Sequence, residues 1–341
     1  MISNVICNSA KQGLIPQREY FDKDIANSDN TNGYYIIESN DFVYNPRKSA
    51  DAPYGPISSY QYPEAGIVSP LYLCFRAKRE INPLYFEWYF RSSTWHRYIY
   101  MSGDSGARHD RVSIKDDVFF AMPINVPSAK EQERISLFLD AIERRIETQR
   151  TLVETLKKYK RGLLNKLFSN INSNIYPTVY LSEVADFLQG LTYSPSDVSV
   201  SGYLVLRSSN IQNGMLSFDD CVYVDKKVDE SLQVKCDDVI MCVRNGSKNL
   251  VGKTALIPPN MPMTTWGAFM MIIRSKLNDT YIFHYLNSQM FFSQVFKDTG
   301  TATINQITKG ILNECRLPLP PETERKQISK MLSSFDAKIQ K

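Results

Sequence analysis

The stretch PSAKEQERISLFLDAIERRIETQRTLVETLKKYKRGLLNKLF, residues 127–168, opens on its only proline and contains a single glycine. Apolar residues recur in it at alternating steps of four and three, and Gln149 and Lys160 fill two gaps in the series. A period of about 3.5 residues is typical of a helix whose apolar seam packs along another helix. The sequence therefore predicts a long helix with the seam Ile135, Leu139, Ile142, Ile146, Val153, Leu156, Leu163 and Leu167.

The start of this helix is marked as well. Pro127 and Ser128 precede an acidic first turn that holds Glu131 and Glu133. Such residues cap the free backbone N–H groups and suit the positive end of the helix dipole. At 1.5 Å per residue, about forty residues form a rod of roughly 60 Å. A rod with one apolar seam needs a partner helix, from this chain or from another.

The end of the chain, PPETERKQISKMLSSFDAKIQK at residues 320–341, repeats the first half of this helix. A shift of 193 positions places Pro127 on Pro320 and Ser136 on Ser329. Two unrelated amphipathic helices would share a seam, but they would not share the proline and the acidic start. We therefore predict a second copy of the helix, with the seam Ile328, Leu332, Phe335 and Ile339.

The residues before each helix also repeat. NDFVYNPR (40–47) overlays DDVIMCVR (237–244), which places Arg47 on Arg244, and the same offset of 197 places Gly55 on Gly252. Further overlays join NPLYFEWYFRS (82–92) to NDTYIFHYLNS (278–288), residues 105–127 to residues 299–321, and ISNVICNSAKQGL at the start to LSEVADFLQGL (181–191). The sequence thus predicts two tandem units of about 190 residues, each a globular part followed by a helix.

Both globular parts are expected to be of the α+β class. Apolar runs such as VSPLYLCF and WGAFMMIIR are typical of strands, and clusters such as IPPNMP are typical of turns. The predicted boundaries place the first globular domain at 1–126 and the long helix at 127–170. The second globular domain follows at 171–319, and the second helix at 320–341.

Composition adds little about the partner. A net charge of +4 neither requires nor excludes nucleic acid. No segment approaches the roughly twenty apolar residues that span a bilayer, so a cytoplasmic protein is expected. The six cysteines form no CxxC pair, which favours reduced and mostly buried thiols over disulfides or zinc.

Familiar catalytic motifs are missing. GSKNLVGKT (246–254) has five residues between its first two glycines where a P-loop has four, and ALIPP, which follows its lysine and threonine, cannot form the required helix. NPLY (82–85) lacks the second proline of the NPPY-type motif of amino-methyltransferases. His96, His109 and His284 are isolated, with neither HExxH nor GxSxG spacing. We expect no active site and no metal.

Basic and amide side chains in the loops are the candidate functional residues. Arginine and lysine hold phosphates or read guanine, and asparagine pairs with adenine. The alternative is a solvated surface, but the repeat of Arg47 at Arg244 favours function for that pair. The predicted DNA contacts are Arg47, Lys48, Arg108, Arg111, Arg207, Asn210, Arg244, Asn245, Lys248 and Lys253.

Two globular units alternating with two long helices resemble the specificity (S) subunits of type I restriction-modification systems. The resemblance is carried by the helix at 127–168, by LSEVADFLQG, YLVLRSSNIQNG, DFVYNPR and GIVSPLY, and by PLPPETERKQI before the last helix. It implies two target recognition domains, pseudo-twofold related and spaced by an antiparallel coiled coil, each reading one half of a split double-stranded DNA site. It also implies a non-catalytic chain that recruits methyltransferase (M) subunits using S-adenosylmethionine and restriction (R) subunits using ATP and Mg.

The chain departs from that pattern at its ends. The second helix stops at the equivalent of Thr148, and the first unit begins at the equivalent of about residue 180. We therefore expect the second helix to be truncated and the seam residues Val153, Leu156, Leu163 and Leu167 to lack a partner within the chain. The alternatives are a truncated or silent allele, a second chain that completes the coiled coil, or a scaffold that binds protein without reading DNA.

Overall fold

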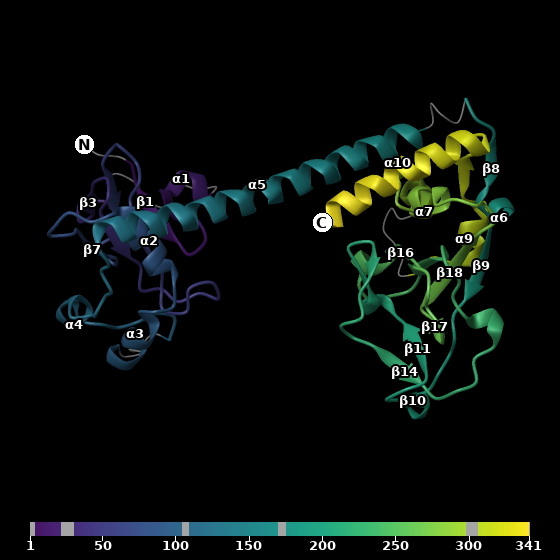
Figure 1. The fold of residues 1–341 in the computed structure, drawn as a ribbon, viewed down its shortest axis with the longest axis horizontal. Coiled ribbons are helices and arrows are strands. Elements are labelled where there is room, and N and C mark those ends of the chain that lie inside the picture. Colours follow the sequence, from purple (N-terminus) through teal and green to yellow (C-terminus); the bar gives the residue numbers. More distant parts are fainter. Residues whose placement is uncertain (1–3, 22–30, 104–108, 170–174, 298–305, 341) are drawn as a thin grey trace. The chain divides into compact units, whose positions relative to one another are not determined.

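The computed structural model describes residues 4–21, 31–103, 109–169, 175–297 and 306–340 (Figure 1). The chain divides into two compact units, Met1–Thr148 and Gln149–Lys341. The division falls within the long helix, whereas the sequence placed boundaries at the ends of that helix. Among the described residues, no helix has both the length and the apolar surface that crossing a bilayer requires.

The first unit is a mixed α+β fold around an aromatic core. Phe42 packs its ring at 5.7 Å from that of Phe90, and the Trp95 indole donates a hydrogen bond to the Phe90 carbonyl. Its elements are β1 (Ile6–Ser9), β2 (Gly13–Pro16), α1 (Gln17–Tyr20), β3 (Tyr35–Ile37), β4 (Phe42–Tyr44), β5 (Ile57–Ser59), β6 (Gly66–Val68), β7 (Leu73–Phe75), α2 (Pro83–Arg91), α3 (His96–Ser102), α4 (Asp116–Phe120) and the first part of α5 (Ala129–Leu167).

The second unit is larger and has the same class of fold. Two four-stranded sheets, β10-β14-β11-β17 and β16-β15-β18-β9, form its centre. Its elements are β8 (Thr178–Tyr180), α6 (Leu181–Val184), β9 (Ala185–Gln189), η2 (Pro195–Asp197), β10 (Val198–Ser199), β11 (Tyr203–Leu206), η3 (Ser208–Asn210), β12 (Ile211–Gln212), β13 (Met215–Leu216), β14 (Val222–Val224), η4 (Glu230–Leu232), β15 (Val239–Cys242), η5 (Lys248–Leu250), β16 (Thr254–Leu256), β17 (Thr264–Trp266), β18 (Met270–Ser275), α7 (Tyr281–Leu286), α8 (Gln289–Val295), α9 (Lys309–Glu314), β19 (Arg316–Pro318) and α10 (Glu322–Gln340).

The same antiparallel ladder forms the core of both units. In the first unit β4 lies between β5 and β7, and in the second β15 lies between β16 and β18. Phe42 is opposite Ser59 and Val239 is opposite Leu256, so the pairing register is conserved at the predicted offset of 197. This conserved register confirms the tandem repeat in three dimensions.

A buried carboxylate at the start of each ladder is part of the repeat. Asp41 accepts hydrogen bonds from the Arg76 guanidinium at 2.5 and 2.8 Å, and Asp238 accepts from Arg274 at 2.8 and 2.7 Å. Each carboxylate also accepts a backbone N–H three residues upstream. Hydrogen bonding to Asp41 raises the pKa of Arg76. This charge-assisted pair ties the residue before β4 to the residue after β7 and stabilises the ladder.

The start of the chain corrects one overlay. Residues 181–191 contain α6 and β9, and β9 pairs with β18. Residues 6–16 instead form the hairpin β1–β2, turning at Gly13 with a φ of 68°. The hairpin β12–β13 likewise contains a glycine of positive φ, Gly214 at 79°, although its turn is shorter by one residue. The short apolar runs align equally well with either segment, and only the strand pairing distinguishes them.

The long helix begins where the sequence placed it. Ser128 caps α5, because its N–H donates to the Glu131 carboxylate at 3.0 Å and its hydroxyl accepts from the Glu131 N–H at 3.4 Å. Hydrogen bonding to Ser128 lowers the pKa of Glu131. The segment NPLY, which lacks the second proline of the methyltransferase motif, forms the start of α2. The Asn82 side chain caps this helix by accepting a hydrogen bond from the Tyr85 N–H at 3.1 Å.

The pairing of the seam differs from the prediction. Leu163 and Leu167 pack against the core of the second unit, together with Ile328 and Leu332 of α10. The ring centroids of Tyr159 and Phe335 lie 5.5 Å apart. The end of α5 therefore packs against α10, and the prediction that it lacks a partner within the chain is wrong. The cause is the pairing of β8 with β19, which holds the start of α10 beside the end of α5, and the two helices run in opposite directions (Figure 1).

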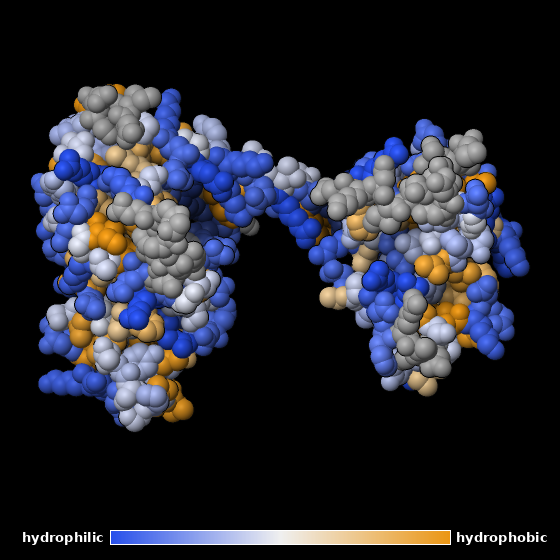
Figure 2. All heavy atoms as spheres, turned by 180° about the vertical axis from the view of Figure 1, so that it is seen from behind, coloured by the Kyte–Doolittle hydropathy of each residue, from blue (hydrophilic) through white to orange (hydrophobic). Residues whose placement is uncertain are grey.

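The first half of the seam is the exposed one. Ile135, Ile142 and Ile146 are 40–42% exposed. Figure 2 shows this stretch of α5 covered mainly by hydrophilic side chains with small apolar spots among them. Gln132 and Ser136, which point into the first unit, are the buried side chains here.

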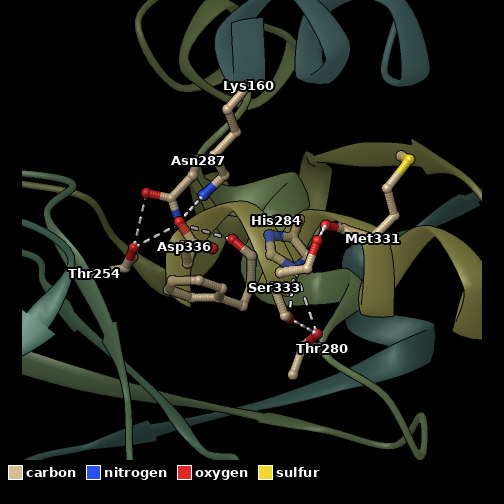
Figure 3. A network of polar contacts seen from close by, with 10 residues as sticks. Lys160, Thr254, Thr280, His284, Asn287, Met331, Ser333 and Asp336 are labelled. Atoms are coloured by element: carbon tan, nitrogen blue, oxygen red, sulfur yellow. Dashed lines mark hydrogen bonds and ion pairs between the residues drawn. The ribbon is translucent and has the colours of Figure 1, made fainter. Parts of the chain in front are cut away.

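A polar cluster joins α5, α7 and α10 in the second unit. Lys160, which fills a gap in the seam, forms an ion pair with Asp336 (Figure 3). Beside it the His284 imidazole lies 3.4 Å from the Thr280 hydroxyl and 3.3 Å from that of Ser333. Burial lowers the pKa of His284 to about 3, and the charge of Lys160 adds to the effect. This histidine therefore belongs to the core and is neutral.

All six cysteines are free, but fewer are buried than expected. Cys242 and Cys315 are buried, whereas Cys236 is exposed and the other three are half-buried. Within the described residues, no group of three or more His, Cys, Asp or Glu side chains could hold a metal ion.

Candidate nucleic-acid interface

The predicted arginines lie on a bridge between two loops in each unit. In the first unit the backbone of Arg47 pairs with that of Arg111, and in the second unit Arg244 pairs with Gln306. Adjacent backbone groups extend both bridges, since Val112 N–H donates to the Pro46 carbonyl at 2.9 Å and Ile307 N–H to that of Val243 at 2.7 Å. These bonds fix the loop that follows β4 or β15.

The bridges refine the sequence overlay. The overlay of residues 105–127 on 299–321 placed Arg111 on Asn305, but the bridge makes Gln306 its structural equivalent. Gln306 was therefore missed as a candidate. Gln306 is identified because the loop bridge is present in both units, and the bridge can be seen only in the three-dimensional structure.

The two shared arginines present their charge at the surface. The Arg47 side chain is 67% exposed, and its Nε lies 3.8 Å from the Asp110 carboxylate. An ion pair this long and exposed contributes little and leaves the cation free to bind an anion. Arg244 lies over the Phe269 ring at 5.3 Å, and Phe269 is itself 59% exposed. Each unit thus offers one accessible guanidinium at the same place on its fold.

A hollow adjoins the bridge in both units. Its volume is about 550 Å³ in the first unit and about 450 Å³ in the second. Pro46 and Val243 line the two hollows at the offset of 197. At the offset of 198 that relates Arg76 to Arg274, the lining residues Pro70, Leu71 and Leu73 align with Ala268, Phe269 and Met271. Arg244, Gln306 and Lys309 line the second hollow directly. The hollow is therefore a repeated feature of the fold.

Asn210 was predicted to contact DNA, but its environment does not fit that role. Its side chain is fully buried, and its amide donates to the carbonyls of Ser217 at 2.9 Å and Asp220 at 3.1 Å. Its amide oxygen accepts from the Arg207 N–H at 2.9 Å. With donors and acceptor engaged, Asn210 holds the β12–β13 hairpin in place and is not placed to contact a base.

The remaining candidates vary in availability. Arg207 forms an ion pair at 2.8 Å with Asp220, which offsets its charge. Asn245 donates to the Ser208 hydroxyl at 3.1 Å and is half-buried. Lys48 is half-buried and Lys253 is exposed. Lys248 begins η5, and Arg108 lies outside the described residues. The strongest candidates are therefore those on the two bridges.

The rejected P-loop also has a structural explanation. Gly252 adopts a φ of 86°, and the chain continues into the strand β16 instead of a helix. Gly55, its repeat equivalent, has a φ of 83°. Both glycines serve the turn that leads into the edge strand of the ladder.

Comparison with known proteins agrees with this architecture. Residues 176–341 match the sequence family described as the type I restriction modification DNA specificity domain. The specificity subunit of the type I restriction enzyme EcoKI, from Escherichia coli (strain K12), is 29% identical over 167 residues, which cover 47% of this chain and 36% of the relative. That of StySPI, from Salmonella potsdam, is 28% identical over 172 residues, covering 48% of this chain and 37% of the relative.

The matched segments thus span little more than a third of those two relatives. For the fold as a whole, the crystal structure of a type I restriction-modification S subunit from M. genitalium gives a TM-score of 0.53 at 14% identity. That match covers 93% of this chain and 81% of the other. Residues 176–341, just under half of the chain, are thus similar to the type I restriction modification DNA specificity domain, and the chain as a whole shares the fold of a type I restriction-modification S subunit.

Proposed function

We propose that this chain is the DNA-reading subunit of a type I restriction-modification complex, and that each unit reads one half of a bipartite, asymmetric double-stranded site. The observation that carries the proposal is the loop bridge with its exposed arginine, present once in each unit beside an equivalent hollow. Arginine held by a fixed backbone suits both phosphate contact and base reading in a groove.

In this proposal the chain is the recognition component and has no catalytic role. Among the described residues there is neither a metal-binding group of side chains nor a phosphate-binding loop that leads into a helix. We propose that methyltransferase subunits supply S-adenosylmethionine chemistry and that restriction subunits supply the ATP- and Mg-dependent steps. Such a role would place the chain in the cytoplasm, where it meets DNA.

A protein-only scaffold is the rival function. It would account for the exposed apolar residues of α5, such as Ile142 and Ile146. It would leave the repeated arginines and hollows without a purpose. DNA reading explains the loop bridge, the arginine and the hollow in both units, so it is the function that we favour.

The test is reconstitution. The purified chain is incubated with genomic DNA, S-adenosylmethionine, ATP and Mg, first alone and then with its methyltransferase subunit. We expect methylation at a bipartite site only when both proteins are present. Methyl transfer or cleavage by the chain alone would contradict the proposal, and so would methylation whose position does not depend on the chain.

A further inference from the structure

The two bridges share one residue and differ in the other. Arg47 and Arg244 are equivalent and identical, whereas Arg111 in the first unit is replaced by Gln306 in the second. Two units that bind the same DNA backbone but read different half-sites have one common task and one distinct task. The conserved arginine suits the common task, and the substituted position suits the distinct one.

Neither side chain at the substituted position makes a hydrogen bond among the described residues. Arg111 is half-buried, and its Nε has no hydrogen-bond partner among the described residues. Gln306 is exposed, lines the hollow beside Arg244, and its amide makes no hydrogen bond within the part of the chain that the structure describes. A desolvated guanidinium nitrogen without an acceptor is costly, which is a reason to expect an acceptor from outside.

In each unit the backbone next to the position is held by hydrogen bonds. Lys48 N–H donates to the Asp110 carbonyl at 2.8 Å, directly before Arg111. In the second unit, the Ile307 N–H bond holds the residue directly after Gln306, and Ile307 is fully buried. A side chain that must distinguish bases needs such a fixed origin, because bidentate contacts tolerate little displacement.

We propose that Arg111 and Gln306 are specificity-determining residues, one in each unit. The Arg111 guanidinium donates two parallel hydrogen bonds to O6 and N7 of a guanine in one half-site. The Gln306 amide donates to N7 and accepts from the N6 amine of an adenine in the other half-site. This assignment rests on the proposed function, and it assigns Arg47 and Arg244 to the phosphates that flank each contact.

The experiment is selection from a library of random duplexes, using the full chain with its methyltransferase subunit. The variants are R111Q and Q306R, with R97Q on α3 and Q289R on α8 as matched controls of the same chemistry at exposed positions. We expect R111Q to replace guanine by adenine at one base pair of one half-site. Q306R makes the reverse exchange in the other half-site. Affinity for the wild-type sequence falls about 10- to 100-fold in each variant, and the controls retain the wild-type motif.

A further variant separates base reading from charge. R111K keeps the positive charge but loses the planar fork, so it is expected to lose the guanine preference while the salt dependence of binding stays unchanged. Thermal unfolding of each variant shows whether the fold is intact. A wild-type motif that persists in both R111Q and Q306R, or R111K binding with full guanine preference, overturns the assignment. A wild-type chain that enriches no motif contradicts the proposed function instead.

Discussion

The two units attach their globular bodies to their helices at the same place but by different chemistry. In the first unit the Asn82 backbone N–H donates to the Gln132 side chain at 3.2 Å, and its amide donates to Ser136 at 3.4 Å. In the second unit Asp279 and Arg325 form an ion pair at 2.7 Å with side chains only 4% and 9% exposed. The repeat has kept the geometry of the joint and exchanged neutral hydrogen bonds for a buried charge pair.

A repeated hydroxyl contact shows how closely the two joints correspond. Tyr85 donates to the Asn125 carbonyl at 3.2 Å, and Tyr281 donates to the Pro318 carbonyl at 2.8 Å. Both bonds hold the segment that leads into the helix. The difference between the joints therefore lies in their charge, and breaking each joint should have consequences of different size.

The largest effect is expected at the charged joint. Asp279→Asn leaves Arg325 buried without a counter-charge and should lower the free energy of unfolding of the second unit by about 3–5 kcal/mol. Asn82→Ala in the first unit removes neutral hydrogen bonds and should cost only about 1–2 kcal/mol. Denaturant unfolding of the full chain, with hydrogen exchange to assign each transition to a unit, measures both.

A double variant controls for packing at the charged joint. Asp279→Leu combined with Arg325→Met removes both charges and should be less destabilising than Asp279→Asn alone. If Asp279→Asn costs no more than Asn82→Ala, the ion pair is not what distinguishes the two joints.

The second effect concerns the equivalent glycines. A Cβ at Gly55, where φ is 83°, would lie 2.0 Å from the Asn45 carbonyl oxygen, which is backbone and cannot yield. At Gly252, where φ is 86°, the nearest atom is 2.9 Å away on the Phe292 ring. Gly55→Ala should therefore cost about 3 kcal/mol and Gly252→Ala about 1–2 kcal/mol. Thermal unfolding compares them, and equal losses would mean that φ alone sets the cost.

The third effect is a pH dependence caused by the buried His284 of the second unit. His284 corresponds in the repeat to Trp88, which does not titrate. Folded His284 stays neutral because burial lowers its pKa to about 3, while the unfolded chain binds a proton near pH 6.5. The unfolded state thus holds more protons in between, so stability falls as pH drops from 7 to 5, by about 2 kcal/mol.

The comparison that tests this pH dependence is His284→Gln, which should remove most of the loss between pH 7 and pH 5 in the second unit. His109→Gln, at an exposed position in the first unit, is the control. Equal pH slopes for wild type and His284→Gln would show that the buried imidazole is not the cause.

Local patterns predicted the features that depend on local chemistry. The cap at Ser128 and the match of Arg47 with Arg244 follow from short-range sequence patterns, and both are found where expected. The α+β class followed from apolar runs bounded by turns. These features need no knowledge of which distant segments meet.

Features that depend on distant pairing could not be predicted in this way. The partner of the end of α5 follows from the pairing of β8 with β19, two strands about 140 residues apart. Asn210 has the residue type of a base-reading side chain, and only its burial shows that it holds a hairpin. Gln306 became a candidate only when the loop bridge aligned it with Arg111.

The central claim is that each unit reads one half of the DNA site, and one selection experiment tests it most directly. Random duplexes are selected with the wild-type chain, Arg111→Ala and Gln306→Ala, each with the methyltransferase subunit. We predict a bipartite motif for the wild type, weakening of one half in Arg111→Ala, and weakening of the other half in Gln306→Ala. A motif that weakens equally in both halves in each variant, or a wild-type chain without sequence preference, would contradict the claim.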